Sequence, residues 1–207
     1  MPRRRDRRQV RHEQTRREIV SAAWRAARAD GLEAVSLRAL AREVGMEPQS
    51  LYTYFASKNE IFDVMFREAN EELLARQQPA DETSDLWVRF TNGAREFVRF
   101  ATEDPVRYLL MFQRVVPGFV PSEQSMAVAT TLLDQPRQAL ADLGVQDPAA
   151  LDLVTSGLAG LIAQQNANEP LGSRWTSLTE RMVRSLLIEV GVQPPADDTA
   201  KPTASRH

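Results

Sequence analysis

Residues 36–62 read SLRALAREVGMEPQSLYTYFASKNEIF, and this stretch decides the fold. Its first part places apolar residues at the spacing of one helical face, directly after Ser36, which is a good N-terminal cap. Gly45 is a natural end for that helix, and Pro48 stands where the next helix would begin. The Ser-Lys-Asn-Glu segment at 57–60 has the spacing of a capping box, in which the serine caps forward and the glutamate reaches back. The stretch therefore predicts successive short helices separated by a tight glycine turn.

A helix with an apolar stripe precedes this stretch, over residues 15–30, and Gly31 is its C-terminal signal. Three helices within about 45 residues, with a glycine turn between the second and the third, form a helix-turn-helix pattern. In such a unit the second helix crosses the DNA backbone and the third lies in the major groove.

Helical periodicity also dominates the rest of the chain, without a convincing alternating strand, so we expect an all-α protein. The stretch 77–85 is polar and contains a proline, which indicates a linker. Asp104-Pro105 and Asp147-Pro148 are helix start signals, each a cap followed by proline in the first turn. The later helices are expected at approximately 57–77, 84–102, 105–113, 122–143, 148–168 and 174–190.

The composition of the 207 residues excludes several classes of function. There is no cysteine, and the two histidines are His12 and His207. No nucleophile elbow, phosphate-binding loop or cluster of metal ligands is present, so we expect no enzyme, no cofactor and no metal site. No apolar run approaches the length of a membrane span, so we expect a cytoplasmic protein without a membrane partner.

The charge distribution is uneven. Residues 1–60 contain 13 Lys/Arg and 8 Asp/Glu, a balance of +5, whereas residues 61–207 contain 13 and 20, a balance of -7. A basic head on an acidic body indicates an anionic partner for the head alone.

Residues 12–62 strongly resemble the DNA-binding domain of TetR (tetracycline-repressor-like) transcriptional regulators. The resemblance rests on a helix that opens with Ser-x-Arg, then a glycine turn, then Leu-Tyr-x-Tyr-Phe and a Ser-Lys capping segment. It implies a three-helix helix-turn-helix DNA-binding domain followed by a C-terminal helical ligand-binding and dimerisation domain. The expected parts are a disordered basic arm (1–11), the DNA-binding domain (12–62, with the fourth helix continuing to about 77 as a connector), a helical regulatory and dimerisation domain (78–192) and a disordered tail (193–207).

The resemblance implies a double-stranded DNA operator as partner and a set of contact residues. Gln49, Ser50 and Thr53 are the candidates for reading bases, because the first turn of the third helix enters the groove. Glu47 and Gln49 replace the serine and glycine that the family often has there. Glu47 would either accept from cytosine or repel phosphate. The complete candidate set is Ser36, Arg38, Glu47, Gln49, Ser50, Tyr52, Thr53, Tyr54 and Lys58, of which Ser36, Arg38 and Lys58 are candidates for phosphate.

The two tyrosines have different expected roles. Leu51 and Phe55 are four residues apart and face the core, which leaves Tyr52 on the adjacent surface, where it suits a phosphate or a thymine methyl group. Tyr54 would contact phosphate or support the fourth helix. The alternative places both rings in the core.

Residues 1–17 contain eight arginines and two acids. We expect this arm to be disordered when free, and to contact the minor groove or phosphates when DNA is present.

The C-terminal part would form a homodimer and a small-molecule pocket. The alternatives are that the aromatic residues are ordinary core, that the polar ones pair across the dimer or face solvent, and that the glycines only relieve crowding. The pocket candidates are Trp87, Phe90, Phe97, Tyr108, Met111, Phe112, Gln113, Phe119, Gln164 and Gln165. The candidates for the dimer interface are Gly157, Gly160, Leu161, Met182 and Leu186.

Two functions remain in competition. The first is a homodimeric repressor that a small-molecule effector releases from a palindromic operator. The second is an architectural or co-regulatory DNA-binding protein whose C-terminal domain binds a protein partner and no small ligand.

Overall fold

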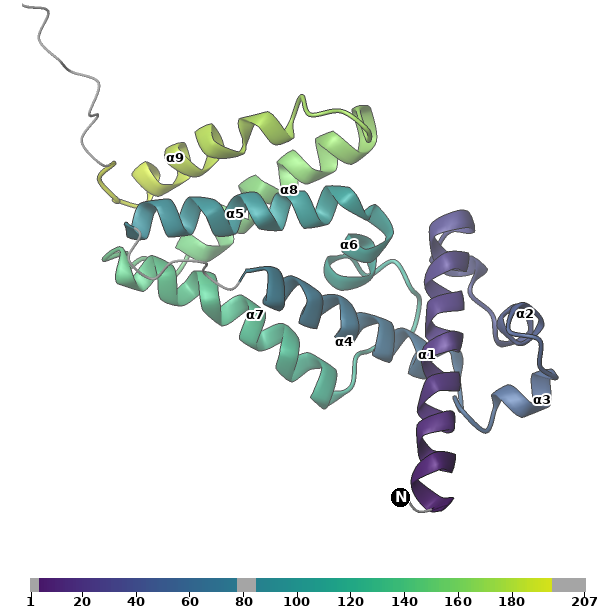
Figure 1. Cartoon of the computed structure of the whole chain (residues 1–207). Helices are drawn as coiled ribbons and strands as arrows, with labels where there is room; N and C mark the ends of the chain where they lie inside the picture. Colours follow the sequence, from purple (N-terminus) through teal and green to yellow (C-terminus); the bar gives the residue numbers. More distant parts are fainter. Residues whose placement is uncertain (1–3, 78–84, 195–207) are drawn as a thin grey trace, which may run out of the picture. The chain divides into compact units, whose positions relative to one another are not determined.

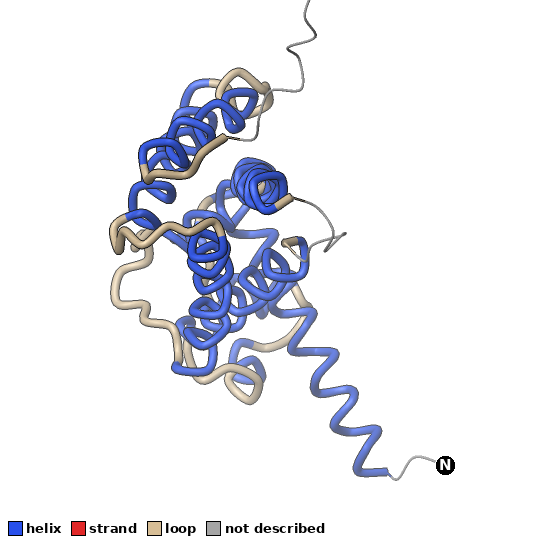
Figure 2. Tube along the Cα trace, turned by 90° about the vertical axis from the view of Figure 1, so that its left-hand side faces the viewer, coloured by secondary structure: helices blue, strands red, loops and turns tan. Residues whose placement is uncertain are grey.

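The computed structural model describes residues 4–77 and 85–194, with side chains described from residue 7 onward. Within these ranges the chain contains helices and loops and no strand, which confirms the expected all-α class (Figure 2). The interior of the linker and most of the tail lie outside the described residues. The helices are α1 (Arg4–Asp30), η1 (Leu32–Ala34), α2 (Leu37–Glu43), α3 (Pro48–Leu51), α4 (Lys58–Arg76), α5 (Leu86–Glu103), α6 (Pro105–Phe112), α7 (Glu123–Asp142), α8 (Ala150–Asn168), η2 (Thr176–Leu178) and α9 (Thr179–Glu189), shown in Figure 1.

The helices group into two compact units. The first contains the described residues within 1–78 and 100–133, and the second those within 79–99 and 134–207. This division differs from the expected domain boundary, because the chain returns to the first unit after residue 99. No helix of the described ranges has the length and apolar character that a bilayer span requires.

The core of the first unit comes from the apolar stripes that the sequence indicates. Ile19 and Ala23 of α1, Leu40 of α2 and Phe62 of α4 are completely buried. Burying a side chain as large as isoleucine, leucine or phenylalanine stabilises a fold by about 1.5–3 kcal/mol. This core holds α2 and α3 in place on the side of α1.

The turn between α2 and α3 depends on Gly45, whose φ is 70°. That conformation is costly for a side chain with a Cβ. The amide of Met46 donates to the carbonyl of Ala41 at 2.9 Å, and the amide of Gly45 donates to that of Arg42 at 3.3 Å. These bonds satisfy carbonyls that the end of a helix leaves open, so the glycine turn follows directly from the sequence.

The basic arm differs from its expectation, because α1 begins at Arg4. Residues 4–30 contain neither glycine nor proline, and pairs four apart bond along the helix, such as Gln9 to Glu13 (3.4 Å) and Gln14 to Glu18 (3.2 Å). Once the later turns of α1 are packed, each further residue adds a hydrogen bond without a new nucleation cost. The expectation of disorder over residues 1–11 is therefore wrong from Arg4 onward.

The segment after α5 returns to pack on α1 and α4. Asp104 caps α6 by accepting from the amide of Arg107 (3.1 Å), and its other oxygen accepts from Arg28 of α1 (2.8 Å). Asp63 of α4 accepts from the amide and the hydroxyl of Ser122, at 2.6 and 2.8 Å. Residues 100–133 therefore complete the first unit.

In the second unit, α8 packs against α9. The helix expected over 174–190 is divided, with η2 before α9. The cause is Gln165, whose Oε1 accepts from the amides of Trp175 (2.9 Å) and Thr176 (3.1 Å) and so fixes a separate turn there.

Candidate nucleic-acid interface

The surface formed by α2, the glycine turn and α3 separates apolar from polar side chains as expected. Leu51 and Phe55 are 0% and 1% exposed, whereas Gln49 and Ser50 are exposed. Tyr52 is 53% exposed, so the alternative that places its ring in the core is wrong. A polar first turn is thus presented outward on a buried anchor, which is the arrangement that reads base edges in a groove.

α3 is shorter than a typical recognition helix and ends at Leu51. Residues 52–54 continue as a turn, in which the amide of Tyr54 donates to the carbonyl of Leu51 at 2.9 Å. The hydroxyl of Thr53 donates to the carbonyl of Ser50 at 2.7 Å. Such local bonding of a threonine competes with regular helix, and it occupies the hydroxyl proton that was expected to face a base.

Tyr54 supports α1 instead of α4. Its half-buried ring stacks on the imidazole of His12, with centroids 4.7 Å apart, and its carbonyl accepts from the guanidinium of Arg16. Of the two roles expected for Tyr54, the geometry favours support, but the supported helix is a different one.

Arg16 is a part of the site that sequence reasoning missed. Its guanidinium lies 4.0 Å from the centroid of the Phe55 ring and 3.2 Å from Oε1 of Glu60, in addition to the bond with Tyr54. One arginine of α1 therefore holds both the end of α3 and the start of α4. The signal was present in the sequence, because His12 and Arg16 continue the stripe of Ile19 at helical spacing.

The serine half of the capping box at the start of α4 is confirmed, whereas Glu60 reaches back to the residue before the cap. The hydroxyl oxygen of Ser57 accepts from the amide of Glu60 at 3.2 Å, and the Glu60 carboxylate accepts from the amide of Ala56 at 2.7 Å. Lys58 follows the cap, but its Nζ donates to the carbonyl of Glu33 (3.3 Å) and lies 5.1 Å from the centroid of the Phe62 ring. An ammonium group has three donors, so a phosphate contact by Lys58 would use those that point away from Glu33.

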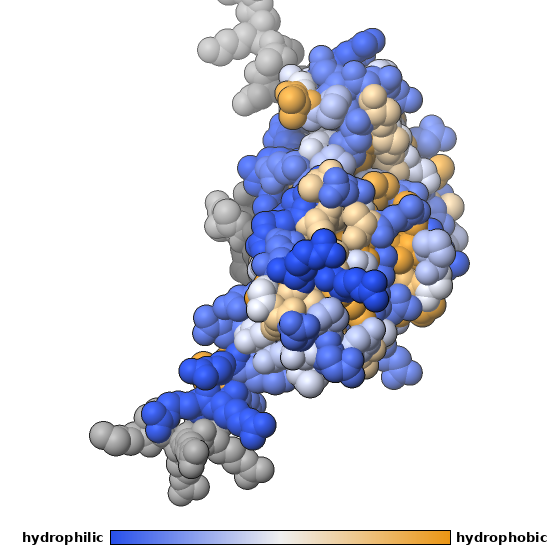
Figure 3. All heavy atoms as spheres, turned by 90° about the vertical axis from the view of Figure 1, so that its right-hand side faces the viewer, coloured by the Kyte–Doolittle hydropathy of each residue, from blue (hydrophilic) through white to orange (hydrophobic). Residues whose placement is uncertain are grey.

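The remaining candidates lie on the same face of the first unit. The hydroxyl oxygen of Ser36 accepts from the amide of Ala39 (3.2 Å) as a cap, and Arg38 is exposed in the first turn of α2. Glu47 is the N-cap of α3 and makes no capping bond through its side chain. Its exposed carboxylate leaves open both the cytosine contact and the phosphate repulsion. Figure 3 shows the side of the first unit on which α2 and α3 lie, where hydrophilic side chains stand between apolar ones.

The ten pocket candidates divide equally between the two units. In the first unit, the rings of Tyr108 and Phe112 lie 5.3 Å apart between centroids. Burial raises the pKa of Tyr108 above its ordinary value, and a hydrogen bond with Gln113 offsets part of that rise. Met111 and Phe119 pack against the core of the head. The other five lie in the second unit: Trp87, Phe90, Phe97, Gln164 and Gln165.

Gln164 and Gln165 are neighbours in the sequence, but they differ in exposure and in their hydrogen-bond partners. Gln165 is 1% exposed and uses both ends of its amide, because its Nε2 also donates to the carbonyl of Glu169. Gln164 is exposed and accepts from Asn168 at 2.8 Å. Gln165 is therefore occupied in joining α8 to η2.

Three of the five dimer candidates, Gly157, Met182 and Leu186, lie where α8 meets α9 within the chain. A Cβ at Gly157 would lie 2.7 Å from Cδ1 of Leu186 and 3.4 Å from the sulfur of Met182, and Leu161 is buried. The alternative that glycine relieves local crowding thus applies to Gly157. Gly160 is exposed and has nothing within 4 Å of such a Cβ.

Comparison with known proteins agrees with this geometry. Residues 19–65 match the family described as "Bacterial regulatory proteins, tetR family". HTH-type transcriptional regulator Mb1846 of Mycobacterium bovis is 30% identical over 125 residues, which cover 58% of this chain and 53% of the relative. HTH-type transcriptional repressor DrrR1 of Streptomyces coeruleorubidus is 28% identical over 170 residues, which cover 78% of this chain and 57% of the relative. The matches thus span about half the length of these curated relatives.

Solved structures share the fold over most of the chain. PfmR, a TetR family transcriptional regulator from Thermus thermophilus, has a TM-score of 0.61 and 22% identity, over 82% of this chain and 97% of that one. An anchored helix, a glycine turn and an exposed polar helix define a helix-turn-helix protein. Over residues 19–65 the chain is therefore similar to the tetR family of bacterial regulatory proteins. The named relatives carry the names of transcriptional regulators.

Proposed function

We propose that the chain is a DNA-binding transcriptional regulator that reads its operator with the first turn of α3. The observation that carries the proposal is that Gln49 and Ser50 are exposed, whereas the next residue, Leu51, is buried in the core. A glutamine in this position can bind adenine through both ends of its amide. The exposed ring of Tyr52 lies beside it and suits a phosphate or a thymine methyl group.

Selection from a pool of random-sequence duplexes, followed by titration on the enriched sequence and on a shuffled duplex, tests this proposal. We expect the full chain to prefer the enriched sequence. Gln49→Ala should weaken that binding by about 5- to 150-fold for each half-site that a subunit reads, because one bidentate base contact contributes about 1–3 kcal/mol. Gln124→Ala removes an exposed glutamine of α7 and serves as the matched control.

Tyr52→Ala should weaken binding to both duplexes if the ring contacts phosphate, and to the enriched duplex alone if it contacts a thymine methyl group. A pool without any enriched sequence would contradict specific reading. Such a result would favour the architectural or co-regulatory alternative, because binding driven by charge alone does not depend on sequence.

The assembly that we propose is a homodimer in which two α3 helices face successive major grooves, about 34 Å apart, on a near-palindromic operator. Support comes from the exposed face of α8, where Leu153, Ser156, Gly160 and Ala163 follow each other at helical spacing. Small residues on a helix face allow a second helix to approach closely. The chain's DNA partner would place the protein in the cytoplasm.

Repression with release by a small-molecule effector completes the proposal. DrrR1 carries the name of a transcriptional repressor, which favours this sign of regulation. An effector would act by binding one conformation better than another, and its effect on DNA affinity cannot exceed that preference. Transcription from a promoter that contains the selected sequence, with and without the protein, distinguishes repression from activation.

A further inference from the structure

The N-terminal part of α1 carries positive charge beside the element that reads DNA. Arg7, Arg8 and Arg11 are exposed along the first turns for which side chains are described. Figure 1 shows this part of α1 extending past α3, and Figure 3 shows its hydrophilic side chains. Both elements belong to the first unit.

Two contacts fix the rotation of this helical extension about its axis. The ring of His12 stacks on Tyr54 (4.7 Å between centroids), and the guanidinium of Arg16 binds the carbonyl of the same residue. A residue four positions earlier lies one turn away on the same helical face. Arg8 is therefore on the side of α1 that faces the end of α3.

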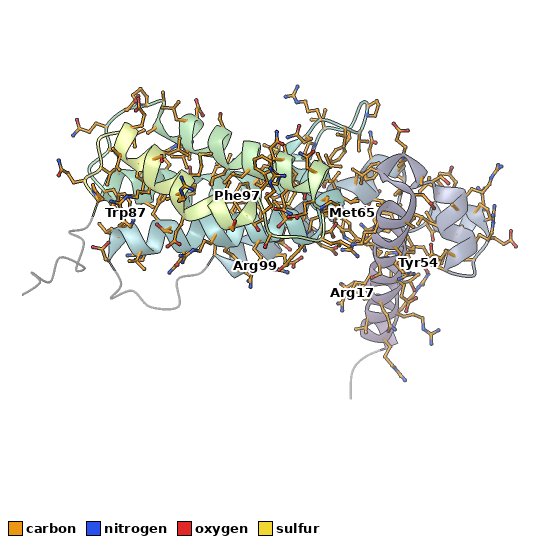
Figure 4. All side chains as sticks on the ribbon, turned by 90° about the horizontal axis from the view of Figure 1, so that it is seen from above. Arg17, Tyr54, Met65, Trp87, Phe97 and Arg99 are labelled. Carbon is orange, nitrogen blue, oxygen red and sulfur yellow. The ribbon has the colours of Figure 1, made fainter. Side chains whose placement is uncertain are left out.

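Arg17 marks the opposite side of the same helix. It is nine positions after Arg8, which corresponds to about two and a half turns and thus reverses the direction of the side chain. Figure 4 shows Tyr54 and Arg17 on opposite sides of α1. Both arginines are exposed and carry the same charge, so they form a matched pair that differs in direction.

We propose that the α1 face centred on Arg8 binds the phosphate backbone that borders the groove read by α3. This inference rests on the proposed function and adds a second contact surface to it. Phosphates line both edges of the major groove, so a helix that runs beside the groove-reading helix and past its end meets them. A guanidinium matches phosphate oxygens with two parallel hydrogen bonds. Such a contact increases affinity without reading sequence.

The salt dependence of binding to a mixed-sequence duplex of about three helical turns tests the inference. The full chain is compared with Arg8→Ala, Arg8→Lys and Arg17→Ala. One phosphate contact contributes about 0.9 to the slope of log affinity against log salt concentration. In a symmetric dimer both copies lose the contact, so Arg8→Ala should lower the slope by about twice that amount, whereas Arg17→Ala should leave it near the wild-type value.

Arg8→Lys should keep most of the slope, because a lysine still neutralises phosphate as a point charge. Equal losses for Arg8→Ala and Arg17→Ala would overturn the inference, since general attraction would then explain both. A wild-type slope for Arg8→Ala would overturn it as well. These failures differ from failure of the proposed function, in which no sequence is enriched from the random pool, because the salt slope is measured on a mixed-sequence duplex.

Discussion

At the scale of single residues, Arg16 shows how one charged side chain of α1 can hold the turn after α3 and the start of α4 together. Its guanidinium is 30% exposed and joins the Tyr54 carbonyl, the Phe55 ring and the Glu60 carboxylate. Glu60 in turn binds the amide of Ala56. The orientation of the turn after α3 therefore depends on a residue of α1.

Replacing Arg16 by alanine should lower the free energy of unfolding by about 1–3 kcal/mol, because partly buried acceptors lose their donor. It should also weaken binding to the selected operator while the salt slope stays at the wild-type value, since no phosphate contact is removed. Chemical denaturation and the salt titration measure the two effects. Arg16→Lys should restore only part of the stability, because an ammonium lacks the planar fork.

The adjacent Arg17→Ala is the control, since Arg17 is exposed, and its stability should change by less than about 0.5 kcal/mol. A reduced salt slope for Arg16→Ala would show that Arg16 contacts phosphate directly and that the positioning role is wrong.

Residue-scale predictions succeed where one helical face decides the outcome. The burial of Leu51 and Phe55 and the exposure of Tyr52 follow from their spacing alone. The roles of Tyr54 and Gln165 could not be predicted, because each depends on partners 10 or more positions away: His12 for Tyr54, and Trp175 for Gln165. Periodicity states which side of a helix is buried, but not which polar group lies opposite.

At the scale of elements, α1 is the clearest departure from expectation. A run of arginines suggests disorder, since like charges repel and apolar residues are scarce. The extension is helical because it continues a helix that is already anchored by Ile19 and Val20. α3 is short: it ends at Leu51, before the turn in which the hydroxyl of Thr53 donates to the carbonyl of Ser50.

The helical extension can be tested with proline. Gln9→Pro should remove the helical turns before residue 9 and leave the rest of α1 intact, because proline is tolerated in the first turn of a helix and breaks its interior. Circular dichroism should therefore show a small loss of helix, with an unchanged midpoint of thermal unfolding, whereas Gln9→Ala should retain the helix. A large fall of the midpoint would mean that the extension stabilises the fold.

At the scale of the whole molecule, the all-α class and the order of the helices could be predicted, whereas the composition of the units could not. Capping residues and glycines indicate where helices begin and end. Asp104 and Ser57 are N-terminal caps, as the sequence predicts. The return of residues 100–133 to the head depends on long-range contacts, such as that of Phe119 with Phe62 (5.8 Å between centroids). No local pattern encodes such a pairing.

Assembly can be tested at Gly160, where the chain offers open space. Gly160→Leu should leave the folded monomer intact, since nothing lies within 4 Å of an added Cβ, but it should prevent close approach of a second α8. Analytical ultracentrifugation should then show a shift from dimer to monomer. Gly93→Leu, at another helical glycine with open space, is the control. A dimer that survives Gly160→Leu would place the interface elsewhere.

The return of residues 100–133 also limits how this protein can be recombined with others. Chimeric regulators are made by exchanging sensor and DNA-binding modules at a junction, and the end of α4 would be the obvious place to cut. A transplant that ends there would leave behind Asp104, Phe119 and Ser122, the partners of Arg28, Phe62 and Asp63. A working graft must therefore carry two separate pieces of chain, because the first unit is discontinuous in the sequence.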